Sequence, residues 1–362
     1  MLAVLKSERL LFAAFVAAVA GFMLEHHLLE MGQGASLVGA AALVAAIVLA
    51  SMRVAHHAEV LAAKVGDPYG TMILTLSAVL VEVIILAIMM TGESSPTLVR
   101  DTIYSAVMLD INGILGLAAL LGGLKHGEQP YNDNSARTYS VMILTAMGIS
   151  MVVPEFVPAQ KWHFYSAFTV GAMIVLYTLF LRMQVGAHSY FFSYSYPRAK
   201  SGGTDVADEP DEPVLPSVVI LLIGVVLIGA LAEIMSGLLT SGLKGSDAPP
   251  AVAAIVVAAI SASPEIMTAM RAALANRMQA VVNIALGASL STVILTVPVM
   301  EAIALYTGQP FIMAMSPVQT VMVTITLIAA AINLNDGQTN AIEGMTHFVL
   351  FATFVMLSAI GL

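Results

Sequence analysis

The sequence predicts an all-α integral membrane protein of about eleven transmembrane helices, arranged as one lone helix followed by two inverted five-helix repeats. Of its 362 residues, 59% are hydrophobic and only 10% are charged, whereas a soluble domain is about half apolar and a quarter charged. The apolar residues come in blocks of about 20, the length that crosses ~30 Å of hydrocarbon as a helix. A third observation, a repeated acidic motif, indicates the two repeats.

The apolar blocks are all of helix length, and none alternates with the period of two that a membrane barrel strand requires. They lie at residues 10–24, 35–52, 70–91, 100–121, 138–153, 164–183, 216–240, 250–274, 279–301, 315–333 and 341–361.

The longest polar stretch, residues 187–215, divides the chain. It is predicted to be an acidic cytoplasmic linker between a first repeat at 35–186 and a second, inverted repeat at 216–362, with an N-terminal helix and loop at 1–34. Its acidic residues are Asp205, Asp208, Glu209, Asp211 and Glu212.

The acidic motif occurs twice. Ala58-Glu59-Val60-Leu61 and Ala232-Glu233-Ile234-Met235 are each followed by a helix with a second acid, in Val81-Glu82-Val83-Ile84 and Pro264-Glu265-Ile266-Met267. The two units start five helices apart, and because five is odd they cross the membrane in opposite directions. Inverted repeats with polar groups at the membrane midplane are a recurrent design of secondary transporters.

The distribution of Lys and Arg predicts the orientation in a bacterial inner membrane, because cytoplasmic loops are enriched in them. With a cytoplasmic N-terminus and a periplasmic C-terminus, Arg100, Lys161 and Lys244 lie outside. The remaining eleven of the 14 lie inside: Lys6, Arg9, Arg53, Lys64, Lys125, Arg137, Arg182, Arg198, Lys200, Arg271 and Arg277.

Composition also excludes several classes of function. The net charge of −9 provides no basic stripe, so nucleic acid is not expected as a partner. Cysteine is absent, which excludes disulfides, thiol catalysis and thiolate metal sites. Phosphate-binding loops, HExxH and nucleophile elbows are missing, so we expect no enzyme and no cofactor. The expected partners are the lipid bilayer and inorganic cations, and a homo-oligomer is left open.

Glu82 and Glu265 are the main candidate site residues, because each lies deep within an apolar block. A charged side chain at this depth costs at least ~2.5 kcal/mol, and its usual reason is an ion or proton pathway. The alternative is a protonated glutamate that is hydrogen-bonded to a neighbouring helix.

The surroundings of these acids favour a hard cation such as Ca²⁺ or Na⁺, which prefers oxygen ligands. Pro264 cannot donate a hydrogen bond to the carbonyl of Ile260, so that oxygen is expected to be free to bind a metal together with Glu82 and Glu265. Burial and mutual repulsion would let the two carboxylates hold either protons or a cation. Nearby hydroxyls are supplied by Thr75, Ser77, Ser261 and Ser263.

Other polar residues within the apolar blocks are weaker candidates. Asp110 could be a third carboxylate or a proton-relay group, or a packed polar residue. Glu59 and Glu233 would lie toward opposite membrane faces, either in the access paths or at the headgroup level. The supporting amides and hydroxyls, which more often join helices, are Asn112, Asn283, Ser289, Ser291 and Thr292.

Three stretches resemble the calcium/cation antiporter superfamily, and within it the bacterial branch of the proton-coupled calcium and sodium exchangers. They are Gly66-Asp67-Pro68-Tyr69-Gly70-Thr71 through Glu82, the stretch from Ser263 to Asn276, and Asn283-Ile284-Ala285-Leu286-Gly287-Ala288-Ser289. The resemblance covers nearly the whole chain. It implies that Glu82 and Glu265 form the central cation site and that alternating access exchanges a cation for protons.

One departure concerns the ion. Many calcium/proton exchangers have Gly-Asn shortly before each central glutamate, where this chain has Ala78-Val79 and Ser261-Ala262. This pattern is nearer the branch that handles sodium as well as calcium.

These observations predict a secondary active antiporter that exports Ca²⁺ and/or Na⁺ in exchange for H⁺. A sodium-coupled calcium exchanger is the alternative within the class, with Asp110 supplying an extra oxygen ligand. A passive cation channel and an intramembrane enzyme are alternatives from other classes.

Overall fold

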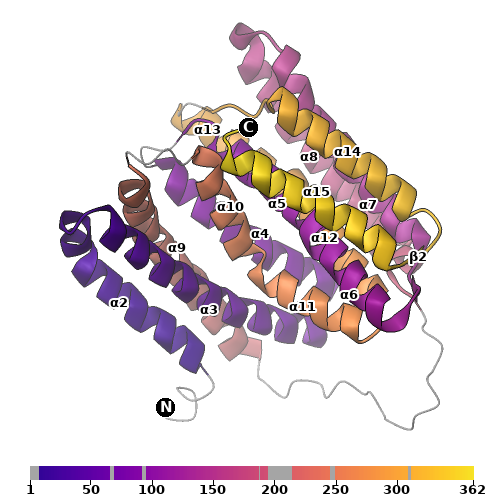
Figure 1. The fold of residues 1–362 in the computed structure, drawn as a ribbon, viewed down its shortest axis with the longest axis horizontal. Coiled ribbons are helices and arrows are strands. Elements are labelled where there is room, and N and C mark those ends of the chain that lie inside the picture. Colours follow the sequence, from indigo (N-terminus) through magenta and orange to yellow (C-terminus); the bar gives the residue numbers. More distant parts are fainter. Residues whose placement is uncertain are drawn as a thin grey trace.

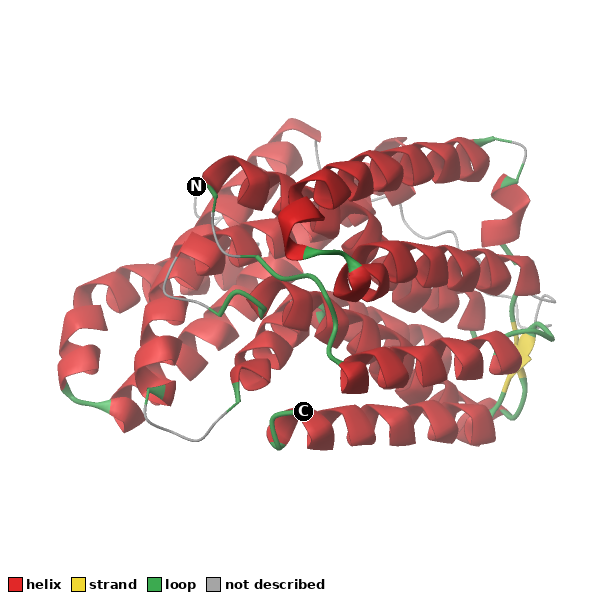
Figure 2. Ribbon diagram, turned by 90° about the horizontal axis from the view of Figure 1, so that it is seen from above, coloured by secondary structure: helices red, strands yellow, loops and turns green. Residues whose placement is uncertain are grey.

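A computed structural model describes residues 8–65, 69–91, 95–186, 188–194, 214–244, 249–308 and 311–362. This part of the chain is almost entirely helical (Figure 2). It contains eight helices long and apolar enough to cross a membrane, or nine if one bent pair counts as a span, and two shorter apolar helices, Leu76–Met90 and Pro317–Asn333. The chain is therefore an all-α protein of many membrane spans.

The elements follow one another in the order of the predicted apolar blocks. The first half comprises α2 (Arg9–Glu30), α3 (Gln33–Val65), α4 (Tyr69–Thr91), α5 (Leu98–Met108), η1 (Leu109–Leu115), α6 (Gly116–His126), β1 (Gln129–Pro130), α7 (Asp133–Met147), η2 (Gly148–Val152), η3 (Val153–Phe156), η4 (Ala159–Lys161), α8 (Trp162–Val185) and η5 (Ser189–Phe192). The second half comprises α9 (Val214–Leu243), α10 (Pro250–Ser261), α11 (Ser263–Leu274), α12 (Met278–Ser291), η6 (Thr292–Thr296), α13 (Val297–Thr307), α14 (Pro317–Asn333), β2 (Gln338–Thr339) and α15 (Ala341–Ala359).

Helices α2, α3 and α9 lie together on one side of the molecule, and α7, α8, α14 and α15 lie on the other (Figure 1). α3 packs along α9 more extensively than any other pair in the described part of the chain. Arg53 of α3 binds Glu8, just before α2, through Nη2–Oε1 at 2.5 Å and Nε–Oε2 at 2.9 Å. This two-point ion pair, the geometry that suits a guanidinium and a carboxylate, attaches the first helix to the bundle.

Two predicted boundaries differ from the structure. α3 continues to Val65 instead of ending near residue 52, so Glu59 lies within the helix. Of the predicted linker 187–215, residues 188–194 fold back against the helices, as described below, and residues 214–215 begin α9. The acidic residues of the linker lie outside the described part of the chain, as does Gly66-Asp67-Pro68.

Several spans depart from a regular α-helix. α10 and α11 meet at an angle of 58°, and Pro264 in the first turn of α11 explains the break, because it cannot continue the α10 hydrogen-bond ladder. Three segments, η1, η2 and η6, are π-helical. Such turns insert an extra residue per turn and often occur at functional sites, and two of them carry residues of the site described below.

A two-stranded antiparallel pairing, which the sequence did not predict, joins the α6–α7 connection to the α14–α15 connection through β1 and β2. Gln129 of β1 is fully buried and its Nε2 donates to the Ala273 carbonyl at 2.9 Å and to Asn276 Oδ1 at 3.0 Å. Because the last carbonyls of a helix have no partner within it, these bonds fix the end of α11, the helix that carries Glu265.

Helices α6 and α15 approach so closely at Gly344 that no side chain fits. A Cβ there would lie 2.7 Å from backbone atoms of Ala119 and Gly116. We expect Gly344→Ala to destabilise the purified protein by about 1–3 kcal/mol, because overpacking against backbone forces the helices apart. Thermal unfolding in detergent measures this effect. Gly171→Ala is the matched control, since that helical glycine has open space around it, and equal midpoints for both variants would contradict the expectation.

Candidate functional site

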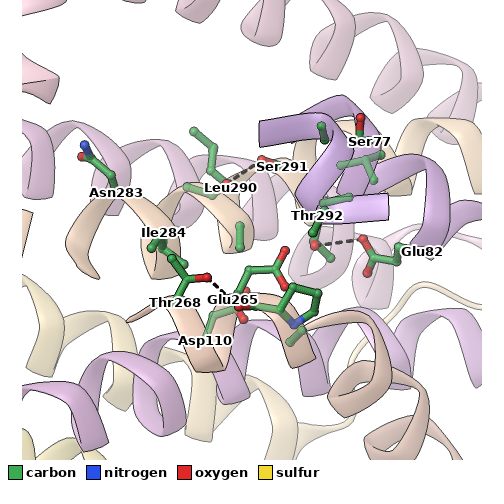
Figure 3. A pocket seen from close by; sticks show the side chains of 18 of the residues that line it. Ser77, Glu82, Asp110, Glu265, Thr268, Asn283, Ile284, Leu290, Ser291 and Thr292 are labelled. Carbon is green, nitrogen blue, oxygen red and sulfur yellow. Dashed lines mark hydrogen bonds between the residues drawn. The ribbon is translucent and has the colours of Figure 1, made fainter. Parts of the chain in front are cut away.

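A cavity of about 530 Å³ lies at the centre of the bundle. Its walls come from both halves of the chain. The first half contributes α3, α4, α5, η1, α7, α8 and η5, and the second contributes α10, α11, α12 and η6. Glu82, Asp110 and Glu265 all line it, and Figure 3 shows their side chains in one close-up of the pocket. The structure thus brings the two predicted central glutamates and the predicted third carboxylate to one space.

Glu82 lies in the middle of α4 and is 4% exposed. Its Oε2 accepts hydrogen bonds from the Thr292 hydroxyl at 3.0 Å and the Thr296 hydroxyl at 2.9 Å, and the first of these is visible in Figure 3. Its Oε1 has no hydrogen-bond partner among the described residues. One oxygen is therefore held by two donors, and the other is left available for a proton or a cation.

Glu265 occupies the first turn of α11, directly after the break that Pro264 introduces. It is partly buried, and its Oε2 also has no partner among the described residues. The N-terminus of a helix carries a partial positive charge and unsatisfied N–H groups, which favour a carboxylate. The broken span therefore places an acid in the cavity where the backbone partly compensates its charge.

Asp110 lies in the π-helical segment η1 and is 2% exposed. Its Oδ2 accepts a hydrogen bond from the Ser289 hydroxyl of α12 at 3.1 Å. The carboxyl shares the cavity with those of Glu265 and Glu82. Ser289 thus supports Asp110 and is not itself among the residues that line the cavity.

The oxygen groups around the break are already engaged with one another. The Ile260 carbonyl, predicted to be free because of Pro264, accepts a hydrogen bond from the Ser263 hydroxyl at 2.8 Å. Ser261 lines the cavity and donates to the Ala258 carbonyl at 3.0 Å. The Ile260 oxygen therefore accepts one hydrogen bond in this conformation, because the side chain one residue before the proline replaces the missing donor. Its second lone pair remains for a cation, so its predicted role as a ligand stays a prediction.

The remaining predicted residues fall in different places. Ser77 is buried and lines the cavity, and Thr75 lies in α4 with a side chain outside the described part. Glu59 lines the cavity and is exposed. Glu233 is also exposed, but on α9 and away from the residues that line the cavity.

Asn112, predicted to support the cation site, faces away from the cavity. Its amide nitrogen donates to the Thr326 hydroxyl at 2.8 Å, and its Oδ1 lies 2.9 Å from His347 Nδ1. It therefore joins η1 to α14 and α15 in a buried polar network.

Two residues of the site are not predicted by the sequence in this role. Thr292 is expected only as a hydroxyl that joins helices, and Thr296 is not expected at the site, yet both donate hydrogen bonds to Glu82. Their spacing of four residues, which puts side chains on one helix face, was an available signal. Glu301 of α13 is a further buried acid, 1% exposed, whose Oε1 accepts from the Ser166 hydroxyl at 3.3 Å.

The described residues contain no cluster of three or more His, Cys, Asp or Glu side chains in an arrangement that could hold a metal ion. In this conformation the three carboxyl groups therefore share a cavity without forming a single coordination sphere.

Comparison with known proteins finds a family match over most of the chain. The sequence model of the sodium/calcium exchanger protein family matches twice, over residues 35–186 and 216–360. A putative ionic transporter, y4hA, of Sinorhizobium fredii is 33% identical over 352 residues, which cover 96% of this chain and 94% of that protein. The sodium-potassium/proton antiporter ChaA of Escherichia coli is 33% identical over 313 residues, which cover 86% of each chain.

Solved structures show the same fold. The structure of native YfkE superimposes with a TM-score of 0.75 at 18% identity, covering 96% of this chain and 99% of that one. The H⁺/Ca²⁺ exchanger CAX superimposes with a TM-score of 0.67 at 15% identity, covering 97% of this chain and 88% of that one.

Proposed function

The chain belongs to the sodium/calcium exchanger protein family, and from this we propose that it is a secondary active antiporter that exports Ca²⁺ and/or Na⁺ in exchange for H⁺. Relatives that cover most of this chain carry names of this activity. They include the sodium-potassium/proton antiporter of E. coli and a Ca²⁺/H⁺ antiporter of Bacillus subtilis, which is 25% identical over 286 residues.

One observation carries the proposal: Glu82 and Glu265, from equivalent motifs in the two halves of the chain, line one cavity, and each has a carboxylate oxygen without a partner among the described residues. A buried carboxylate with no cation beside it strongly favours its neutral, protonated form, because low dielectric penalises the charge. The same oxygens are ligands for hard cations. Protons and a cation would therefore compete for one set of oxygens.

The exchange cycle follows from this competition. In the state open to the periplasm, protons bind Glu82 and Glu265 and displace the cation. The protein then opens to the cytoplasm, where the protons leave and a new cation binds. Because the two glutamates bind either protons or a cation and not both, inward proton flow drives outward cation movement. Asp110 would add a third acidic group to the same space, held by Ser289.

We also propose eleven spans in two inverted repeats of five helices after one lone helix. The two shorter apolar helices, the bent α10–α11 pair and the eight longer helices account for this number, and the two family matches support the division into repeats. The surplus of Lys and Arg on one side supports a cytoplasmic N-terminus and a periplasmic C-terminus. The C-termini of α8 and α11 and the N-termini of α7 and α12 would then face the cytoplasm.

Proton movement in everted membrane vesicles tests the function. Vesicles from a host without its own exchangers are given a respiratory proton gradient, followed with a pH-sensitive dye, and then supplied with Ca²⁺, Na⁺ or K⁺. We expect Ca²⁺ or Na⁺ to dissipate the gradient in vesicles that contain the protein and not in matched vesicles without it. If no cation moves protons, the proposal is wrong.

Sodium-coupled calcium exchange is a second candidate, favoured by one observation: Asp110 supplies a third carboxyl in the same cavity. Such exchange needs more oxygen ligands than two carboxylates provide. Calcium uptake driven by a sodium gradient, with the pH equal on both sides, distinguishes it. Calcium flux under those conditions would favour the second candidate over proton exchange.

A further inference from the structure

The cavity has a second end, far from the carboxylates. α12 and η6 run along its length, and Asn283 and Thr292 both line it. At 1.5 Å per helical residue these nine residues separate the two side chains by ~13 Å, and Figure 3 shows Asn283 well apart from Glu82. The first end contains Glu82, Asp110 and Glu265, and the second contains amides and aromatic rings.

A short segment that follows α8 forms part of this second end. We call residues 189–193 the strap; it includes the 3₁₀ turn η5, Ser189–Phe192. Ser189, Phe192 and Ser193 line the cavity, and Ser189 and Ser193 are also exposed at the protein surface. The strap therefore lies at the mouth of the cavity, with one side toward the interior and the other toward the surroundings.

Aromatic packing seats the strap. The ring of Phe192 lies 5.3 Å from that of Tyr139 in α7 and 5.7 Å from that of Phe180 in α8, both in edge-to-face arrangements. These distances and angles are the favourable ones for aromatic pairs. Tyr139 and Phe180 also line the cavity, so Phe192 closes an aromatic wall across its mouth.

Two asparagine side chains hold the strap by its backbone carbonyls. Asn283 Nδ2 donates to the Phe192 carbonyl at 2.9 Å. Asn132 Nδ2 donates to the carbonyls of Tyr190 at 2.9 Å and Ser193 at 3.2 Å. Water competes for neutral hydrogen bonds of this kind, so each adds only modestly to stability. The strap is therefore held in place and can still be released.

Gln279 connects the two asparagines. Its Nε2 donates to Asn283 Oδ1 at 2.8 Å, and its Oε1 accepts from the backbone N–H of Asn132 at 2.7 Å. The Asn283 side chain thus donates to the strap through its nitrogen and accepts from Gln279 through its oxygen. Both polar atoms of the Asn283 amide are therefore engaged at the strap end of the cavity, whereas the sequence suggested a residue that supports the cation site.

We propose that Asn132 and Asn283 are positioning residues of the exchange cycle, which hold the strap across the mouth of the cavity. The strap must move before a cation reaches Glu82 and Glu265 from this side, and it returns when the cavity closes. This inference rests on the proposed exchange function, because it assigns a step of that cycle to a named segment.

The chain contains no cysteine, so pairs of introduced cysteines can be cross-linked without background reaction. An Asp133→Cys, Ser193→Cys double variant, which keeps the Asn132 side chain on the strap, is treated with a flexible bis-methanethiosulfonate linker in everted vesicles. Cation-driven proton movement is recorded before linking, with the linker in place, and after its removal with dithiothreitol. We expect exchange to stop with the linker in place and to return after reduction.

The matched control is an Asn333→Cys, Thr346→Cys pair. Asn333 and Thr346 join α14 to α15 through a side-chain hydrogen bond of 3.3 Å, and neither residue lines the cavity. Linking this pair should leave exchange unchanged. Full exchange by vesicles in which mass spectrometry shows the strap pair to be linked would overturn the proposal.

A second measurement does not depend on cross-linking. Ser77→Cys places a thiol inside the cavity, and its rate of reaction with a charged, membrane-impermeant thiol reagent reports access from the strap side. We expect Asn283→Ala to raise this rate about fivefold to tenfold, the population change that one lost hydrogen bond produces. A merely structural role would lower the yield of folded protein and leave the rate unchanged, which would contradict the proposal.

Different results would contradict the exchange function and the role of the strap. If wild-type vesicles show no cation-driven proton movement, the exchange function itself is wrong. If wild-type vesicles exchange normally, and neither the linker nor Asn283→Ala has the expected effect, the function stands and the strap is only a structural loop.

Discussion

Glu82→Gln and Glu265→Gln are each expected to abolish cation-driven proton movement, with a loss of at least about a hundredfold. Glutamine keeps the shape of the side chain and removes both the charge and the titratable proton. Removing one charged partner of a buried pair costs about 3–5 kcal/mol, and each 1.4 kcal/mol is a factor of ten in affinity. The measurement is the dye response of everted vesicles over a range of Ca²⁺ and Na⁺ concentrations.

The control for these variants is Glu155→Gln, which changes an exposed acid of η3 that does not line the cavity. It should exchange as the wild type does. Equal amounts of folded protein in the membrane must be shown for all three variants by size-exclusion chromatography. Wild-type exchange by either central variant would remove that glutamate from the mechanism.

The depth of the two central glutamates could be predicted from the sequence because an acid within an apolar block is costly and therefore rare. An acid within an apolar block can be recognised without knowing which side chains form hydrogen bonds to it. The break before Glu265 was similarly accessible, since Pro264 removes a backbone hydrogen bond from the middle of an apolar block. Hydropathy blocks located the helices for the same reason: the thickness of the bilayer sets their length.

The spacing of Thr292 and Thr296 indicates that they share a helix face, but which acid that face meets could not be predicted, because it depends on how distant helices rotate against each other. Thr292 and Thr296 lie 210 and 214 residues after Glu82 in the chain. The π-helical geometry of η6 also shifts which side chains face inward.

Asn112 faces away from the cavity for a reason that helix geometry predicts. Two residues along a helix are about 200° apart around its axis, so Asn112 and Asp110 should be expected on opposite faces. The structure shows this, with Asp110 toward the cavity and Asn112 toward Thr326 and His347.

The strap was missed for a different reason. Residues 187–215 have no apolar periodicity, and their acidic centre made the whole stretch read as a solvated linker. The first residues of that stretch are aromatic, however, and Phe192 packs on Tyr139 and Phe180. A change of composition within this stretch, from aromatic to acidic, was the available signal that its aromatic start packs against the helices.

Thr292→Val and Thr296→Val are expected to raise the cation concentration for half-maximal exchange, by about tenfold or more each. Valine matches threonine in shape and lacks the hydroxyl that donates to Glu82 Oε2. A hydrogen bond to a charged group contributes about 1.5–3 kcal/mol. Without these donors the charged form of Glu82 is less stable, so protons compete more strongly with the cation for the same carboxylate.

The pH dependence separates this explanation from simple misfolding. Because the variants favour the protonated form of Glu82, their exchange should recover as the pH on the cation-loading side rises, whereas a misfolded protein stays inactive at every pH. Thr353→Val is the matched control, because that exposed hydroxyl donates to the Val349 carbonyl of its own helix, α15. A loss of exchange that alkaline pH does not relieve would show that Thr292 and Thr296 support the fold of η6 and do not tune Glu82. Recovery at alkaline pH would instead assign to η6 the balance between proton and cation at the central site.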